Sequence, residues 1–551
     1  MTPFIVALFL AAPPMSPLQT AEKAIESKGL LERIQTMASD VFEGRSPGTK
    51  GEEVTVAYLV DQMKAIGLEP GNPDGTYLQR VPLVGAVSTY RAELDTQGKR
   101  EELLAHRDLV AVSQRQVPKV SIDKTDMVFV GYGVVAPEYG WDDFKDVDVR
   151  GKTVVMLIND PQVADPADPT KLDPKLFKGP GMTYYGRWTY KFEIAAKKGA
   201  VAALIIHNTE RAAYPWSVVV DSWGRENFAT VAADKNAGRA AIESWITEDA
   251  ARRLFKDSGL DLEALTKAAA LRDFKPVPLR QKLSMTLERT ERQVQSHNVI
   301  GKISGSEAAD AARYLVYSAH WDHFGRDDKR EGDKVFHGAL DNASGTSGML
   351  EIAEAFKALN KPAKATVVFV ATTGEERGLL GAKYYVENPL YPLARTLANI
   401  NLDGVNPWGR TKDLQLVGDR VSTLDEALEW VTKQVGRVLV ADAHPERGTP
   451  YRGDSFEFAK AGVPALWLYK GNDYIGKAKG FGDEQSAKFF AKDYHKPSDV
   501  VGADWDLAGG VEDLRIGFRL GYRVAQDAKW VEWKPDAEFA AKRRETAALR
   551  N

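Results

Sequence analysis

The 551-residue sequence contains no cysteine. This absence excludes disulfide bonds, a thiolate nucleophile and any metal site with cysteine ligands, so a metal could be held only by His, Asp and Glu. The sequence also has no marked excess of positive or negative charge, because it contains 73 Lys and Arg residues and 77 Asp and Glu residues. Binding to nucleic acid or to an anionic membrane normally needs a basic surface. We therefore expect a neutral or small substrate and no nucleic-acid partner.

Long apolar runs are confined to the N-terminus. Residues 4–12 are apolar and are followed by Pro and small residues, which is typical of a signal peptide. We predict that residues 1–20 form such a signal and that the protein is periplasmic or secreted. An uncleaved anchor or a wrongly assigned start of the sequence is the alternative, because no basic residue precedes the run. No later run approaches the roughly 20 apolar residues that cross a bilayer, so we expect no stable membrane association after cleavage.

The chain is longer than the roughly 300 residues at which a single core stops growing, so two domains are expected. Residues 21–90 predict helices around a glycine-rich turn. In residues 91–290, short β-rich stretches alternate with turns, which predicts a separate α/β unit of mostly strands. In residues 291–530, continuous apolar runs alternate with helical segments, which indicates a mostly parallel sheet covered by helices on both faces. A tail, 531–551, follows.

Polar side chains follow the apolar runs of the last large segment. In open α/β sheets, ligands bind outside the carboxyl ends of the strands, so these side chains are candidates for a site. The runs "RYLVYSAH", "ATVVFVATT" and "LANINLDG" are each followed or closed by such residues. The candidate ligands from strand ends and loops are His320, Asp341, Glu375, Glu376, Asp403 and His495.

This concentration of carboxylates predicts a metal centre. Several carboxylates could not share a partly dry crevice as bare anions, because each uncompensated buried charge is strongly destabilising. Imidazole and carboxylate ligands together suit zinc, which binds four or five ligands. Two His and even three of these four carboxylates are too many for one catalytic zinc with an open position. They fit two zinc ions per chain that share one bridging carboxylate.

The motifs "HWDH", "GALDNASG", "GEERGLLG", "NLDG" and "YHKPSD" occur in this order and resemble those of the M28 family of di-zinc aminopeptidases. The resemblance covers the last large segment and the N-terminal helices. It implies an α/β fold of the phosphorylase/hydrolase type, with a mixed, mostly parallel sheet flanked by helices. Residues 21–90 and 291–530 would then belong to one zinc peptidase domain.

The resemblance also implies a role for each metal ligand. His320 and Asp403 would bind one zinc, and Glu376 and His495 would bind the other. Asp341 would bridge the two ions.

Two further roles follow from the same resemblance. Glu375 would be the general base that takes a proton from the metal-bridging water, and Asp322 would hydrogen-bond the imidazole of His320. The peptide bond between Asp341 and Asn342 would be cis.

The segment from "GYGVVAPEYGW" to "GAVAALIIHN" resembles a protease-associated domain inserted into the peptidase domain. Such a unit could narrow access to the zinc centre and limit the substrates to short or extended peptides. A structural appendage without substrate contact is the alternative.

The stretch "PYRGDSFEF" is similar to the family segment beside the substrate, and it makes Tyr451, Arg452, Asp454 and Phe456 candidates for the substrate pocket. Gly453 and Ser455 depart from the Ser-Asp-His pattern that the family often shows, so the side-chain preference stays open.

Together these features predict a zinc-dependent exopeptidase that removes N-terminal residues from peptides. A carboxypeptidase or dipeptidase on the same scaffold is the alternative, with Arg45, Arg326 or Arg452 gripping a C-terminal carboxylate. A single-zinc acyl transferase similar to glutaminyl cyclase and a non-catalytic, receptor-like binding protein are more remote alternatives.

Overall fold

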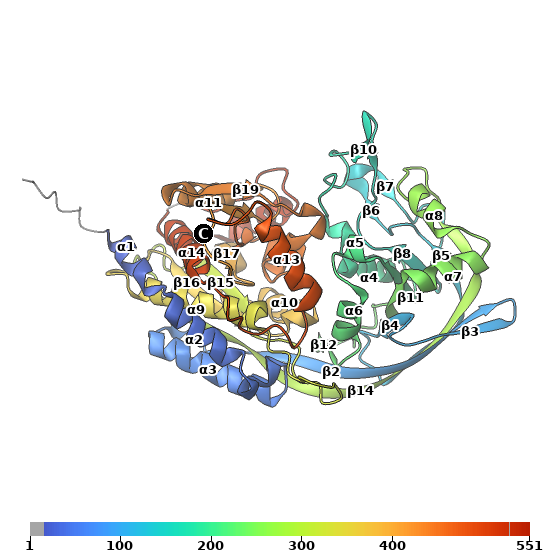
Figure 1. Ribbon diagram of the computed structural model, residues 1–551, viewed down its shortest axis with the longest axis horizontal. Helices are drawn as coiled ribbons and strands as arrows, with labels where there is room; N and C mark the ends of the chain where they lie inside the picture. The colour runs from blue at the N-terminus through green and yellow to red at the C-terminus, as the bar shows by residue number, and fades with distance from the viewer. Residues whose placement is uncertain (1–15, 528, 551) are drawn as a thin grey trace, which may run out of the picture.

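The computed structural model describes residues 16–527 and 529–550 (Figure 1). Most of the predicted signal peptide therefore lies outside the described residues. Within them, none of the helices combines the length and the apolar character that spanning a membrane requires.

One sheet of fourteen strands runs through the molecule. Along its main path the strands are β20 (Ala465–Trp467), β17 (Thr396–Asn401), β15 (Tyr314–His320), β16 (Thr366–Thr372), β14 (Val277–Ile303), β5 (Lys119–Phe129), β8 (Thr153–Leu157), β11 (Ala202–His207), β13 (Ile242–Thr247) and β4 (Leu109–Val112). The branching strands are β1 (Glu69–Pro70), β2 (Leu78–Thr96), β3 (Lys99–Leu103) and β12 (Asn227–Thr230).

The first half of this sheet is mostly parallel, as the sequence predicts. Strands β20, β17, β15 and β16 are parallel, and β14 is antiparallel to β16. Alternate residues of each strand face different helical layers, because successive side chains of a strand point to opposite faces. One layer contains α2 (Ser27–Met37), α3 (Lys50–Ile66), α9 (Gly345–Lys357), α11 (Thr423–Gln434) and α14 (Ala508–Gln526), and the other contains α10 (Leu380–Glu387) and α12 (Ser455–Lys460).

Two long strands join the halves of the molecule. β14 contains 27 residues and β2 contains 19, and they pair from Val299 and Leu78 to Lys282 and Asp95. Figure 1 shows this ribbon running beneath both halves. The boundaries predicted after residues 90 and 290 fall within these strands, because both strands are shared by the two halves.

The second half of the sheet lies within residues 91–290, which we call the inserted unit. Strands β5, β8, β11 and β13 are parallel, and β4 closes the edge in the antiparallel sense. Its helices are α4 (Trp188–Lys197), α5 (Thr209–Ala212), α6 (Trp216–Trp223), α7 (Glu248–Asp257) and α8 (Leu262–Ala268). α4 and α6 lie on the side that faces α13 (Phe481–Lys492) of the first half (Figure 1). The assignment of this unit to the protease-associated domains stays a prediction.

Candidate metal centre

The carboxyl ends of β15, β16 and β17 lie side by side and carry most of the predicted ligands. β15 ends at His320, and Asp403 follows β17 by two residues. After β16, the chain turns at Gly374, whose φ of 64° lies in the left-handed region that favours glycine. This turn places Glu375 and Glu376 directly beyond the end of the strand.

Asp341 comes from the tight turn Ala339–Ser344 that precedes α9. Its peptide bond to Asn342 is cis, as the resemblance implied. The buried carboxylate of Asp499 accepts hydrogen bonds from the main-chain N–H groups of Leu340, at 2.9 Å, and of Asp341, at 3.0 Å. Asp499 therefore holds the turn that carries Asp341.

The two carboxylate oxygens of Asp341 face two different imidazole rings. Oδ1 lies 3.3 Å from His320 Nε2, and Oδ2 lies 3.3 Å from His495 Nε2. Asp403 Oδ1 is 3.3 Å from the same nitrogen of His320, and Glu376 Oε2 is 3.1 Å from that of His495. The structure thus brings all the predicted metal ligands together, in two groups that share Asp341.

These distances fit a divalent metal. Ligand atoms on a tetrahedral zinc with bonds of about 2.0 Å are about 3.3 Å apart. His320 Nδ1 donates to the main-chain carbonyl of Asp322 at 3.1 Å, so Nε2 of the neutral ring offers a lone pair to two carboxylates. His495 Nε2 is buried and makes no hydrogen bond. A cation beside each of these nitrogens would satisfy both the lone pairs and the carboxylates.

His323 adds a side chain that the sequence did not assign to a metal. Its Nδ1 lies 2.6 Å from Glu376 Oε1, so the two oxygens of Glu376 face His323 and His495. In the described part of the chain, two groups of potential ligand atoms lie close together. These groups are His320, Glu375 and Asp403, and His323, Asp341 and Glu376.

Asp322 differs from its predicted role. The main-chain carbonyl of Asp322 accepts the hydrogen bond from His320, whereas the carboxylate Oδ1 of Asp322 is 3.8 Å from His320 Nδ1. That carboxylate instead accepts the main-chain N–H of Glu375 at 3.0 Å. Asp322 therefore orients both the imidazole and the turn that carries Glu375.

The adjacent glutamates have opposite pKa shifts. Burial and the charges of Asp403 and Glu376 raise the pKa of Glu375 well above its usual value, although His320 opposes them. Burial also acts to raise the pKa of Glu376, but His495 and its other partners lower it to about 2. Glu376 thus stays ionised, whereas Glu375 readily holds a proton, as a general base must after accepting one.

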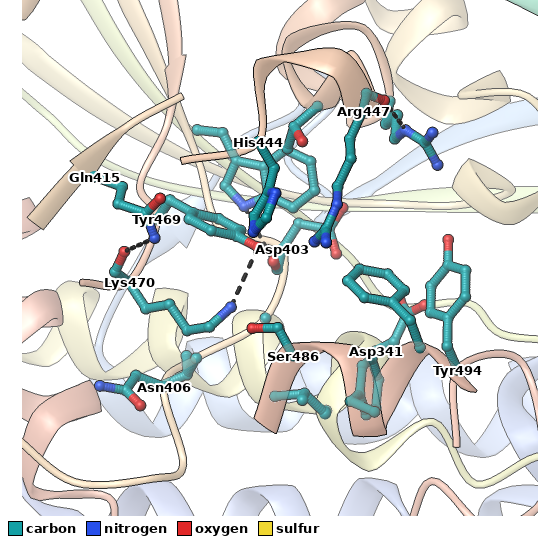
Figure 2. Close-up of a pocket in the computed structure, with 18 of the residues that line it drawn as sticks. Asp341, Asp403, Asn406, Gln415, His444, Arg447, Tyr469, Lys470, Ser486 and Tyr494 are labelled. Carbon is teal, nitrogen blue, oxygen red and sulfur yellow. Dashed lines mark hydrogen bonds between the residues drawn. The ribbon is translucent and has the colours of Figure 1, made fainter. Parts of the chain in front are cut away.

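A cleft of about 140 Å³ opens on this centre. Asp341, Asp403 and Tyr494 line it, and Arg447 and Lys470 extend toward its middle (Figure 2). We call it the first cleft.

A second cleft, of about 270 Å³, lies between the inserted unit and the first half of the molecule. The two clefts share Glu375, Glu376, Arg452 and Tyr494, so the metal centre faces both.

The four predicted pocket residues have different surroundings. Arg452 lines both clefts, and Tyr451 and Phe456 form part of the wall of the second. Tyr451 donates its hydroxyl to Glu538 at 2.9 Å. Asp454 lines neither cleft, because its buried carboxylate accepts a hydrogen bond from the hydroxyl of Thr372 at the end of β16.

Two of the three arginines that were candidates for binding a carboxylate lie elsewhere. Arg45 is fully buried and donates to main-chain carbonyls, including those of Trp321 and Gly338, so it supports the strand-end loops. Arg326 is exposed and pairs with Asp328. Both expectations were wrong, because sequence alone cannot show which arginine reaches the cleft.

Two contacts to His495 were missed by sequence reasoning. The ring of Tyr494 stacks on His495 with centroids 3.7 Å apart, and its position beside a metal ligand could have suggested this. The hydroxyl of Ser222, on α6 of the inserted unit, lies 3.4 Å from His495 Nδ1. No local pattern could have indicated a contact between residues so distant in the sequence.

Comparison with known proteins agrees with this geometry. Residues 298–518 match the sequence profile of peptidase family M28. The chain is 30% identical over 222 residues to a glutamate carboxypeptidase 2 homolog of Caenorhabditis elegans, covering 39% of this chain and 26% of that one. It is 40% identical over 96 residues to aminopeptidase YwaD of Bacillus subtilis, covering 17% and 20%. The chain thus spans about a quarter or less of each relative's length.

One solved structure is similar over almost the whole chain. The aminopeptidase from Aneurinibacillus sp. strain AM-1 has a TM-score of 0.50 and 17% identity, with 95% of this chain and 97% of that chain covered. At this identity the likeness concerns the fold. The part of the chain that matches the sequence profile of peptidase family M28 contains all the predicted metal ligands.

Proposed function

We propose that this protein is a zinc-dependent exopeptidase that removes N-terminal residues from peptides. The observation that carries the proposal is the bridging position of Asp341, whose two oxygens face His320 and His495 at 3.3 Å each. Glu375, a buried carboxyl group, lies beside this arrangement, with an oxygen 3.9 Å from His320 Nε2. Aminopeptidase YwaD, a relative by sequence, supports the direction of attack.

Two zinc ions would be held by different ligands. His320 and Asp403 would bind one ion, Glu376 and His495 the other, and Asp341 would contact both. When bound, such ions polarise the scissile carbonyl and lower the pKa of a water molecule toward about 7.

Glu375 would move the proton. Its carboxylate accepts a proton from the attacking water and delivers it to the nitrogen of the leaving amine as the peptide bond breaks. The main-chain hydrogen bond from Glu375 to Asp322 fixes the turn during this transfer. The raised pKa of Glu375 favours the protonated state between the two events.

The first cleft would bind the free α-amine of the substrate. Its walls carry Asp341, Asp403 and the two glutamates. Carboxylate oxygens not engaged by metal would accept hydrogen bonds from the ammonium group. Peptides are therefore the expected partners, and export through the N-terminal signal would place the activity in the periplasm or outside the cell.

A carboxypeptidase or dipeptidase is the second candidate. Arg452 lines both clefts and has a cationic group for a C-terminal carboxylate, and one relative by sequence is named a glutamate carboxypeptidase homolog.

The test compares wild type with Glu375→Gln on aminoacyl-anilides and on N-blocked peptides. We expect zinc to be retained by both proteins, free N-termini alone to be cleaved, and kcat to fall by about 10²- to 10⁴-fold in the variant. Glu331→Gln, at an exposed loop position, is the matched control. Cleavage of N-blocked peptides from the C-terminus would favour the carboxypeptidase, and unchanged turnover in Glu375→Gln would exclude Glu375 as the base.

A further inference from the structure

Arg187, in the inserted unit, is a buried cation without a partner. Arg187 is 8% exposed, and its Nε makes no hydrogen bond. Among the described residues, no carboxylate lies within ion-pair distance of its guanidinium group. Burial and the positive charge of Arg452 lower its pKa to about 10. An uncompensated buried charge is strongly destabilising, so this position calls for an anion.

The position of Arg187 in the fold indicates that a molecule bound beside the metal centre would supply this anion. Arg187 directly precedes α4, and α4 lies on the side of the inserted unit that faces α13 of the first half (Figure 1). It lines the second cleft together with Glu375, Glu376 and His495. A molecule that occupies this cleft could therefore contact Arg187 and the metal centre at once.

Arg452, in the first half of the molecule, supplies a second cation that lines the same cleft. Its Nε donates to the carbonyl of Arg447 at 2.7 Å, and its Nη2 donates to that of Ala212 at 3.1 Å. Its guanidinium also lies 5.5 Å from the ring centre of Tyr214. These contacts fix Arg452 in place, but both hydrogen-bond acceptors are neutral, so its charge is also uncompensated.

The acidic side chains of the second cleft are engaged elsewhere. Glu193 accepts the hydroxyl of Tyr184, and Glu243 pairs with Arg239. Glu457 pairs with Lys460, and the two remaining glutamates belong to the metal centre. Hence none of the carboxylates that line the cleft neutralises the two arginines.

We propose that Arg187 and Arg452 together bind a carboxylate of the substrate, and that the inserted unit thereby selects acidic or short peptides. Guanidinium groups bind carboxylates through charge-assisted, often bidentate hydrogen bonds. The carboxylate is either the C-terminus of a di- or tripeptide or the side chain of an Asp or Glu residue. This inference rests on the proposed peptidase function and adds a substrate class to it.

The test measures the preference for an acid over its neutral counterpart in wild type and in Arg187→Met. The substrates are Leu-Gly-Gly and its C-terminal amide, and the p-nitroanilides of Glu and Gln. In wild type, we expect kcat/KM to be about 10- to 100-fold higher for the acid in one of these pairs, which identifies the source of the carboxylate. Arg187→Met should bring that ratio close to one.

Two controls separate binding from structure. Arg150→Met, on the exposed surface of the inserted unit, should keep the ratio of wild type. Arg187→Met removes an uncompensated buried charge, so its thermal unfolding midpoint should not fall. A clear fall would show that Arg187 has a structural role and would overturn the proposal, as would a wild-type ratio near one in both pairs.

Isothermal titration calorimetry with Gly-Gly and with its C-terminal amide measures binding without turnover. Binding that prefers the acid and is lost in Arg187→Met supports the carboxylate site, even if none of the substrates is cleaved. In that case the proposed peptidase function would be refuted, and the proposed carboxylate-binding site would stand. Equal binding of acid and amide would overturn the binding site alone.

Discussion

Replacing Asp499 by Asn tests whether the metal centre depends on the turn that carries Asp341. Asp499 is 2% exposed, and each of its oxygens accepts one main-chain N–H, from Leu340 at 2.9 Å and from Asp341 at 3.0 Å. An asparagine side chain has only one acceptor oxygen, so one of the two N–H groups would face an NH₂ group. Leaving a buried donor without an acceptor destabilises a protein by about 1–3 kcal/mol.

The larger effect is expected on the metal. A displaced turn moves Asp341, whose oxygens lie 3.3 Å from the imidazole nitrogens of His320 and His495. Substitution of a group that orients a metal ligand typically weakens metal affinity about 10- to 100-fold. We therefore expect Asp499→Asn to lose zinc at chelator concentrations that wild type withstands.

The assay is zinc content by elemental analysis after dialysis against a graded series of a competing chelator. Asp504→Asn, an exposed carboxylate five positions further along the chain, is the matched control. If Asp499→Asn unfolds at a lower temperature but releases zinc at the same chelator concentration as wild type, the proposed link between the turn and the metal is refuted.

Three further perturbations have defined outcomes. Removing metal with a chelator should lower the midpoint of thermal unfolding, and readdition of zinc should restore it. A bound ligand stabilises the folded state, and without metal the carboxylates around Asp341 lose their compensating charge. An unchanged midpoint would contradict a bound metal. Arg45→Met should lower the free energy of unfolding in urea by roughly 4 kcal/mol, since several buried carbonyls lose their donor, and a loss below about 1 kcal/mol would show that Arg45 is dispensable. Burial lowers the pKa of His207 to about 4, so protonation of this side chain favours the unfolded chain. The stability that neutral His207 preserves is fully present above the unfolded pKa of about 6.5 and is lost as the pH falls toward 4. The loss in the free energy of unfolding amounts to about 3 kcal/mol. His207→Gln should therefore show a shallower loss of stability over this pH range, and identical profiles would refute the assignment.

Local sequence determined the metal-binding part of this protein. The apolar runs that form β15, β16 and β17 are continuous because these strands are covered on both faces, so their ends could be located from composition alone. Ligands such as His320 and Glu376 sit at those ends, and parallel strands bring their carboxyl ends to one edge. Without cysteine, only His, Asp and Glu could form the centre, and the structure brings the predicted set together.

Tertiary structure alone decided which other side chains reach that centre. Asp322 contacts His320 through its main chain instead of its carboxylate, a distinction that depends on the path of the loop. Ser222 contacts His495 and Arg187 lines the second cleft because the β2–β14 ribbon joins the inserted unit to the first half of the molecule. Contacts of this kind depend on pairing between segments far apart in the chain, and no local periodicity encodes that pairing.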